Sequence, residues 1–211
     1  LASLKGASDL LNLTKDERQK VKLLKVLSND VERIERLITD YSQVLKDEAS
    51  QSRAVAKNFD LVHLIESIIE DFNLDTINQK KNIKFIFLNQ NKINKATIFG
   101  IESRIEQVIA NLLDNSVSFS PINSQITIDL NFDKNNYKIS IKDQGPGFDE
   151  NNLDKVFERF YSDRPDDQEG SHSGLGLNIV KNIIDSHKGV IKAYNKLNGE
   201  GAVVDITLPS V

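Results

Sequence analysis

The first fifty residues carry an apolar repeat that only a helix packed against other helices can bury. Apolar side chains recur at alternating spacings of three and four residues, at Leu24, Leu27, Val31, Ile34, Ile38, Tyr41 and Leu45. This stripe predicts a helix with a coiled-coil seam. The segment from Thr14 to Glu17 reads as a capping box, so the helix is expected to begin at about residue 15. Upstream, the apolar positions Leu4, Ala7 and Leu11 predict the end of an earlier helix.

Residues 1–53 are therefore predicted to form a helical hairpin whose first arm is short. Two helices bury only part of such a stripe, so we expect two copies of the chain to associate into a four-helix bundle. A seam that packs against the rest of the same chain is the alternative, because heptads alone do not fix the partner.

Composition narrows the class of protein. The 211 residues are 39% hydrophobic and carry a net charge of −4. We find no apolar run long enough to span a membrane, no export leader, no cysteine and no cluster of Lys and Arg typical of nucleic-acid binding. Methionine is absent even at position 1, so we expect this sequence to be a piece of a longer chain.

From Asp60 onward helical and strand patterns alternate. Asp60 is expected to cap a helix that runs to about Asn78, and residues 102–118 show a second amphipathic helix. Strands are expected at residues 84–88, 97–100, 126–130, 137–141, 190–194 and 202–208, and a further helix at residues 175–187, ended by Gly189 in a left-handed conformation. The predicted class is α+β, with an α/β sandwich over residues 54–211 following the hairpin.

Three polar or glycine-rich features suggest chemistry. Asn111 and Asn115 lie four residues apart and share one helix face, where amide oxygens suit a Mg²⁺ ion that bridges phosphates. Asp143 opens a glycine loop at a strand end, where its carboxylate could accept a hydrogen bond from an exocyclic amino group such as that of adenine. The cluster from Gly170 to Leu177 precedes a helix, whose N-terminus favours phosphate.

In this order the features resemble the sensor histidine kinases of two-component systems, whose ATP-binding domain belongs to the GHKL superfamily. The resemblance rests on four motifs. They are the N box Asn111-Leu112-Leu113-Asp114-Asn115-Ser116, the first glycine box Asp143-Gln144-Gly145-Pro146-Gly147-Phe148, the F box Val156-Phe157-Glu158-Arg159-Phe160-Tyr161 and the second glycine box Gly174-Leu175-Gly176-Leu177.

The resemblance implies a site for ATP and Mg²⁺ covered by a lid over residues 160–173. It implies that Asn115 binds Mg²⁺, that Asn111 contacts phosphate or metal, that Asp143 recognises adenine and that Arg159 steadies the transferring phosphoryl group. Nucleotide contacts are further implied for Phe119, Gly145, Gly147, Gly174, Leu175, Gly176 and Leu177.

For the whole protein, the resemblance implies the cytoplasmic part of a bacterial sensor anchored in the inner membrane by segments absent from this chain. It implies transfer of the γ-phosphoryl group to a His upstream of Leu1 and then to an Asp of a response regulator. None of the three histidines replaces that acceptor: His63 and His187 read as structural or surface residues, and His172 falls in the lid.

One position departs from the family pattern. Ser118 stands where the family commonly has a Lys that reaches the phosphates, which would shift charge neutralisation to Mg²⁺, Arg159 and Arg164. Two alternatives stay open. One is a degenerate dimeric module that binds nucleotide without kinase activity, and the other is a different GHKL ATPase, such as a serine kinase of anti-sigma type or a gyrase-like clamp.

Overall fold

The computed structural model describes residues 2–14, 16–28, 30–31, 34, 55–90, 92–161, 174–197 and 201–211. The chain divides into two compact units, of which the larger holds residues 53–161 and 176–211 and the smaller holds the remainder. The predicted domain boundary between residues 53 and 54 lies outside the described residues and stays a prediction. The same holds for the lid residues 162–173, including Arg164 and His172, and for the seam positions Ile38, Tyr41 and Leu45.

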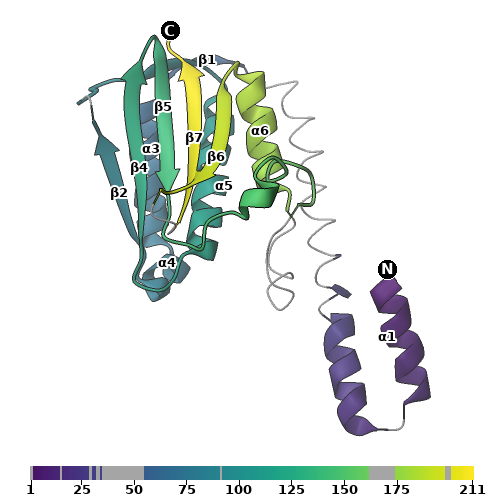
Figure 1. The fold of residues 1–211 in the computed structure, drawn as a ribbon. Coiled ribbons are helices and arrows are strands. Elements are labelled where there is room, and N and C mark those ends of the chain that lie inside the picture. The colour runs from purple at the N-terminus through teal and green to yellow at the C-terminus, as the bar shows by residue number, and fades with distance from the viewer. Residues whose placement is uncertain are drawn as a thin grey trace. The chain divides into compact units, whose positions relative to one another are not determined.

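The smaller unit begins with two helices, as the sequence predicts. α1 spans Ala2–Leu13, and residues 17–28 form the second helix (Figure 1). The cap differs from the prediction: the side chain of Asp16, not Thr14, accepts a hydrogen bond from the Arg18 amide at 2.9 Å. The Thr14 hydroxyl instead donates to Gln19 at 2.8 Å. Asp and Thr are both favoured at the N-cap, and Asp16 takes this role directly before the helix begins at residue 17.

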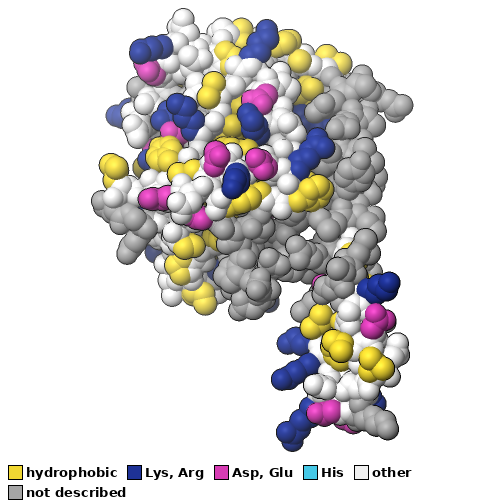
Figure 2. All heavy atoms as spheres, turned by 45° about the vertical axis from the view of Figure 1, so that its right-hand side comes forward, with side chains coloured by type: hydrophobic (Ala, Val, Ile, Leu, Met, Phe, Trp, Pro, Cys, Tyr) yellow, Lys and Arg dark blue, Asp and Glu magenta, His cyan; other side chains and the backbone are white. Residues whose placement is uncertain are grey.

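The seam of the second helix is only partly covered. Leu24 is 53% exposed and Val31 is 46% exposed. Figure 2 shows hydrophobic side chains at the surface of the hairpin. This exposure agrees with the expectation that another helix covers the seam, although association itself stays a prediction.

The larger unit is built on a mixed sheet of five strands in the order β2-β4-β5-β7-β6 (Figure 1). Its strands are β2 (Lys84–Asn89), β4 (Gln125–Asp133), β5 (Asn136–Lys142), β6 (Val190–Asn195) and β7 (Ala202–Pro209). β2 runs parallel to β4, and the other neighbouring pairs are antiparallel. A separate antiparallel pair joins β1 (Lys57–Asp60) to β3 (Thr97–Gly100).

Three helices cover one face of this sheet: α3 (Leu61–Leu74), α5 (Glu102–Phe119) and α6 (Gly176–Ser186) (Figure 1). The core between the layers is fully buried at Ile105, Ile109, Leu113, Ile126, Ile128, Leu130 and Ile139. Burying each such side chain contributes about 1.5–3 kcal/mol relative to leaving it exposed. The predicted class, a helical hairpin followed by an α/β sandwich, is confirmed.

The helix that Asp60 caps ends earlier than predicted. The Asp60 side chain accepts from the Val62 amide at 3.0 Å, as expected. The chain then leaves the helix at Asp75, whose carboxylate accepts from the Asn78 amide at 3.0 Å and so starts α4 (Thr76–Lys81). A short acceptor side chain at this point offers the backbone a new cap in place of a continued helix.

The end of α6 corrects a second expectation. The left-handed residue is Lys188, at φ +57°, and not Gly189. The Gly189 amide closes the turn by donating to the Ile184 carbonyl at 2.9 Å. A Cβ on Gly189 would lie 2.7 Å from the Thr207 carbonyl oxygen, so glycine is required there for close approach and not for its φ angle.

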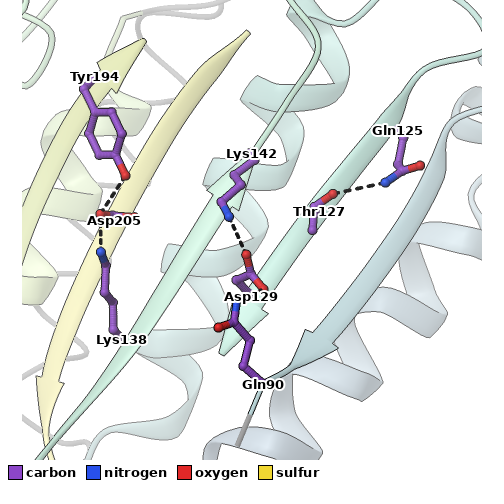
Figure 3. A network of polar contacts seen from close by, with 8 residues as sticks. All are labelled: Gln90, Gln125, Thr127, Asp129, Lys138, Lys142, Tyr194 and Asp205. Atoms are coloured by element: carbon purple, nitrogen blue, oxygen red, sulfur yellow. Dashed lines mark hydrogen bonds and ion pairs between the residues drawn. The ribbon is translucent and has the colours of Figure 1, made fainter. Parts of the chain in front are cut away.

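The opposite face of the sheet carries two hydrogen-bonded carboxylates (Figure 3). Asp129 pairs with Lys142 and accepts from Gln90 at 3.0 Å. Asp205 lies 2.7 Å from the Lys138 ammonium and accepts from the Tyr194 hydroxyl at 3.0 Å. Burial acts to raise the pKa of Asp205, but side-chain hydrogen bonds from Lys138, Ser140 and Tyr194 hold it below its usual value.

Candidate functional site

The N-box asparagines lie on α5, the central helix of the covering layer. Asn111 and Asn115 are half-buried and share one face of the helix. A Cβ built on Gly176, the first residue of α6, would lie 3.6 Å from the Asn115 amide nitrogen. The N box and the second glycine box therefore meet beside the Asn115 amide.

Asp143 lies directly after β5 and is only 7% exposed. Its Oδ1 atom accepts hydrogen bonds from the Gly145 and Ala202 amides, both at 2.9 Å. Burial raises the pKa of Asp143, and hydrogen bonds from Ala202, Gly145 and Ser116 together with the charge of Lys196 offset part of that rise. Main-chain donors thus fix the orientation of the carboxylate, which suits a group that accepts a hydrogen bond from a ligand.

The two glycines of the first glycine box are required for different reasons. A Cβ on Gly145 would lie 3.0 Å from the Phe119 carbonyl oxygen, so this glycine packs against the end of α5. Gly147 adopts φ +83°, which L side chains rarely tolerate. Phe119 itself is 38% exposed.

The remaining predicted residues lie in the F box and the second glycine box. Arg159 is exposed, and the Phe157 carbonyl accepts from the Asn178 side chain of α6 at 2.9 Å. Gly174 adopts φ +71°, Leu175 is buried, and Gly176 and Leu177 are half-buried at the start of α6. The first turn of α6 leaves amide groups that favour an anionic ligand.

Both ends of α5 are capped by other elements, which the sequence analysis did not predict. At its start, Nε2 of His187 accepts from the Ile101 amide at 3.1 Å. Because a main-chain N–H can only donate, the ring proton is on Nδ1, which donates to the Ile183 carbonyl at 2.8 Å. At its end, Nζ of Lys81 donates to the Val117 carbonyl at 2.8 Å. His187 is therefore structural, as its position in the sequence suggested.

No described residues are arranged as a metal cage. Among the parts of the chain that the structure describes, no group of three or more His, Cys, Asp or Glu side chains is placed to hold a metal ion. The half-buried Asn115 nevertheless suits Mg²⁺ bound largely by phosphate and water, because a neutral amide oxygen is a hard ligand. Within the described ranges, no helix combines the length and apolar character needed to cross a membrane.

Comparison with known proteins identifies the larger unit. Residues 100–211 match the model of the histidine kinase-, DNA gyrase B- and HSP90-like ATPases. The chain belongs to this family. The match starts at Gly100, the last residue of β3, and includes all four motifs. Together with the sensor kinases described next, it confirms the predicted resemblance to the ATP-binding domain of sensor histidine kinases.

Relatives and solved structures agree with this family. Sensor protein ChvG of Rhizobium meliloti (strain 1021) is 36% identical over 208 residues, covering 96% of this chain and 36% of that protein. Sensor histidine kinase WalK of Bacillus subtilis (strain 168) is 30% identical over 192 residues, covering 89% of this chain and 30% of that protein. The chain thus spans about a third of the length of these relatives.

The fold also matches the catalytic domain of histidine kinase ThkA. The two share 28% identity and superpose with a TM-score of 0.64, covering 74% of this chain and 95% of that one. The layer of helices on a mixed sheet is therefore the histidine-kinase type of ATP-binding fold.

Proposed function

We propose that the larger unit binds ATP with Mg²⁺ and supplies the γ-phosphoryl group for histidine phosphorylation. One observation supports this most: segments far apart in the sequence converge on α5. Gly145 of the first glycine box lies against the Phe119 carbonyl, and Gly176 of the second lies beside the Asn115 amide. Both glycines therefore lie against α5, Gly145 at its last residue and Gly176 beside the N-box residue Asn115.

Asp143 is proposed to recognise adenine. Its Oδ1 atom is occupied by two main-chain amides, so the orientation of the carboxylate is set before any ligand arrives. An acceptor fixed in this way selects an exocyclic amino group, because a carbonyl at the same position would be repelled. The exposed ring of Phe119 is proposed to lie against the base.

Asn115 is proposed to hold Mg²⁺, with Asn111 beside it toward metal or phosphate. When bound, the metal supplies positive charge that balances the phosphate oxygens. Main-chain amides of Gly174, Gly176 and Leu177 are proposed to bind phosphate at the start of α6, and Leu175 to line the nucleotide wall. Arg159 is proposed to stabilise the phosphoryl group during transfer.

In the intact protein the acceptor is proposed to be a His upstream of Leu1. Its ring nitrogen forms a bond to the γ-phosphorus as the bond from that phosphorus to the bridging oxygen breaks, and ADP leaves. The phosphoryl group then passes to an Asp of a response regulator. The hairpin is proposed to form a homodimer, and the chain to be the cytoplasmic part of a membrane-anchored sensor.

The test is calorimetric titration of the 211-residue chain with a non-hydrolysable ATP analogue, with and without Mg²⁺. Asn115→Ala and Asp143→Ala should each weaken binding by roughly 1–3 kcal/mol, because a partner group is left unpaired. Asn58→Ala, at an exposed position of strand β1, is the matched control and should bind like the parent. Loss of the Mg²⁺ dependence in Asn115→Ala would identify the metal ligand.

Two outcomes would contradict the proposal. If the parent binds no nucleotide at millimolar concentration, the nucleotide site is wrong. If a longer chain that carries the upstream His binds ATP and Mg²⁺ but incorporates no acid-labile phosphate, a dimeric nucleotide-binding module becomes the better interpretation. Ser118, in place of the usual Lys, is the feature that favours this alternative.

A further inference from the structure

Asn195, the last residue of β6, lies outside the four motifs and makes two hydrogen bonds to the first glycine box. The amide oxygen of Asn195 accepts from the Phe148 main-chain N–H at 2.7 Å, and its amide nitrogen donates to the Phe148 carbonyl at 2.8 Å. The two bonds span 47 residues of sequence. One side chain thus satisfies both main-chain groups of Phe148 and fixes the direction in which the loop leaves the site.

The same side chain explains the glycine next to Phe148. A Cβ on Gly147 would lie 2.6 Å from the amide oxygen of Asn195 and 3.0 Å from its Cγ atom. The backbone at Gly147 also has φ +83°. Gly147 is therefore constrained by its conformation and by the close approach of Asn195, a residue that no glycine-box pattern contains.

The glycine loop is consequently anchored at two points. At its start, the Asp143 carboxylate holds the Gly145 amide at 2.9 Å. At its end, Asn195 holds Phe148. A loop tied at one end only would sample more conformations, and a ligand would bear the entropy cost of ordering it.

We propose that Asn195 is a positioning residue of the nucleotide site, which preorganises residues 145–148 so that nucleotide affinity depends on its two amide hydrogen bonds. This inference rests on the proposed nucleotide-binding function. Asn195 acts through the main chain of Gly147 and Phe148, and no contact between its side chain and the nucleotide is required.

The chain offers a matched control. Asn89, at the end of edge strand β2, makes the same pair of bonds to Ile93: it accepts from the Ile93 amide and donates to the Ile93 carbonyl, both at 2.8 Å. β2 and β6 form opposite edges of the sheet. Asn89→Ala removes an equivalent clamp away from the glycine loop, so it reports the general cost of losing such a contact.

The experiment compares the parent, Asn195→Ala, Asn195→Ser and Asn89→Ala by thermal unfolding, by titration with a non-hydrolysable ATP analogue, and by hydrogen exchange at the Phe148 amide. Asn195→Ala should bind the analogue about tenfold more weakly, because both hydrogen bonds between the Asn195 amide and the Phe148 main chain are lost. Asn195→Ser should lie between Asn195→Ala and the parent. Asn89→Ala should change affinity less than about twofold while losing a similar amount of thermal stability.

A local readout separates positioning from general destabilisation. Exchange at the Phe148 amide should accelerate in Asn195→Ala and stay unchanged in Asn89→Ala. The inference is wrong if both Asn195 variants bind like the parent, or if Asn89→Ala weakens binding as much as Asn195→Ala. If Asn195→Ala does not fold, Asn195→Ser decides alone. If the parent binds no nucleotide, the proposed function has failed instead, and the exchange result still shows whether Asn195 orders the loop.

Discussion

The contact between His187 and Gly100 allows a stability prediction that can be worked out from the structure. His187→Ala removes the acceptor for the Ile101 amide at the start of α5, a loss of about 1 kcal/mol for a helix cap. It also removes the Nδ1 hydrogen bond to the Ile183 carbonyl, worth a further ~1 kcal/mol. We therefore expect the free energy of unfolding to fall by about 2 kcal/mol in total.

Gly100→Ala should also destabilise the fold, because it adds a side-chain atom next to the His187 ring. A Cβ there would meet the imidazole ring, with its Nε2 atom at 2.7 Å, and overpacking of this kind costs about 1–3 kcal/mol. The backbone of Gly100 lies outside the left-handed region, so the cost is steric and not conformational. In His187→Ala the ring is absent, and the added methyl group should fit.

The double variant should therefore be less destabilised than the sum of the single variants, by about 1–2 kcal/mol. Urea unfolding followed by far-UV circular dichroism measures all four proteins, with the midpoint and slope reported separately. Strictly additive effects, or a Gly100→Ala variant as stable as the parent, would refute the proposed contact.

Three further predictions concern charge, close packing and association. Burial raises the pKa of Asp143, so the protonated carboxyl stabilises the folded state in acid, and this stabilisation is lost as pH rises through the folded-state pKa. In urea unfolding between about pH 4 and pH 7, Asp143→Asn should therefore gain stability relative to the parent as pH rises. The same variant should bind nucleotide less tightly. Gly189→Ala should cost about 1–3 kcal/mol in the same assay, because its Cβ meets the main-chain oxygen of Thr207. Val31→Lys, on the seam, should shift the chain toward monomer in analytical ultracentrifugation, whereas Val26→Lys, exposed but off the seam, should not.

Elements with a local signal were predicted well. The apolar period of α5 and the alternation in β4 and β5 are each repeated several times, so neighbouring positions support one another. Ends of elements depended on single residues. Asp75 stops one helix and starts the next, and Lys188 takes the left-handed position that Gly189 was expected to hold, because Gly189 is required for packing against β7.

In the site, too, residues with a local sequence signal were predicted and residues that act through long-range contacts were not. Its motif residues could be found because each short pattern carries its own chemistry, and the structure brings Asn115 beside Gly176 and Phe119 beside Gly145. The residues that hold these motifs in place had no such signal. The contacts of His187 to Ile101, Asn195 to Phe148 and Lys81 to Val117 span 86, 47 and 36 residues, and only the tertiary fold brings their partners together.

The position of Lys81 bears on the departure at Ser118. A lysine ammonium does lie at this end of α5, but it donates to the Val117 carbonyl at 2.8 Å and lies 3.4 Å from the Ser118 and Ser120 carbonyls. These contacts satisfy the last carbonyls of the helix and balance the negative end of its dipole. A lysine engaged in this way is not free to follow a phosphate group. Under the proposed function, the charge that the usual Lys would supply must then come from the metal at Asn115 and from arginine side chains.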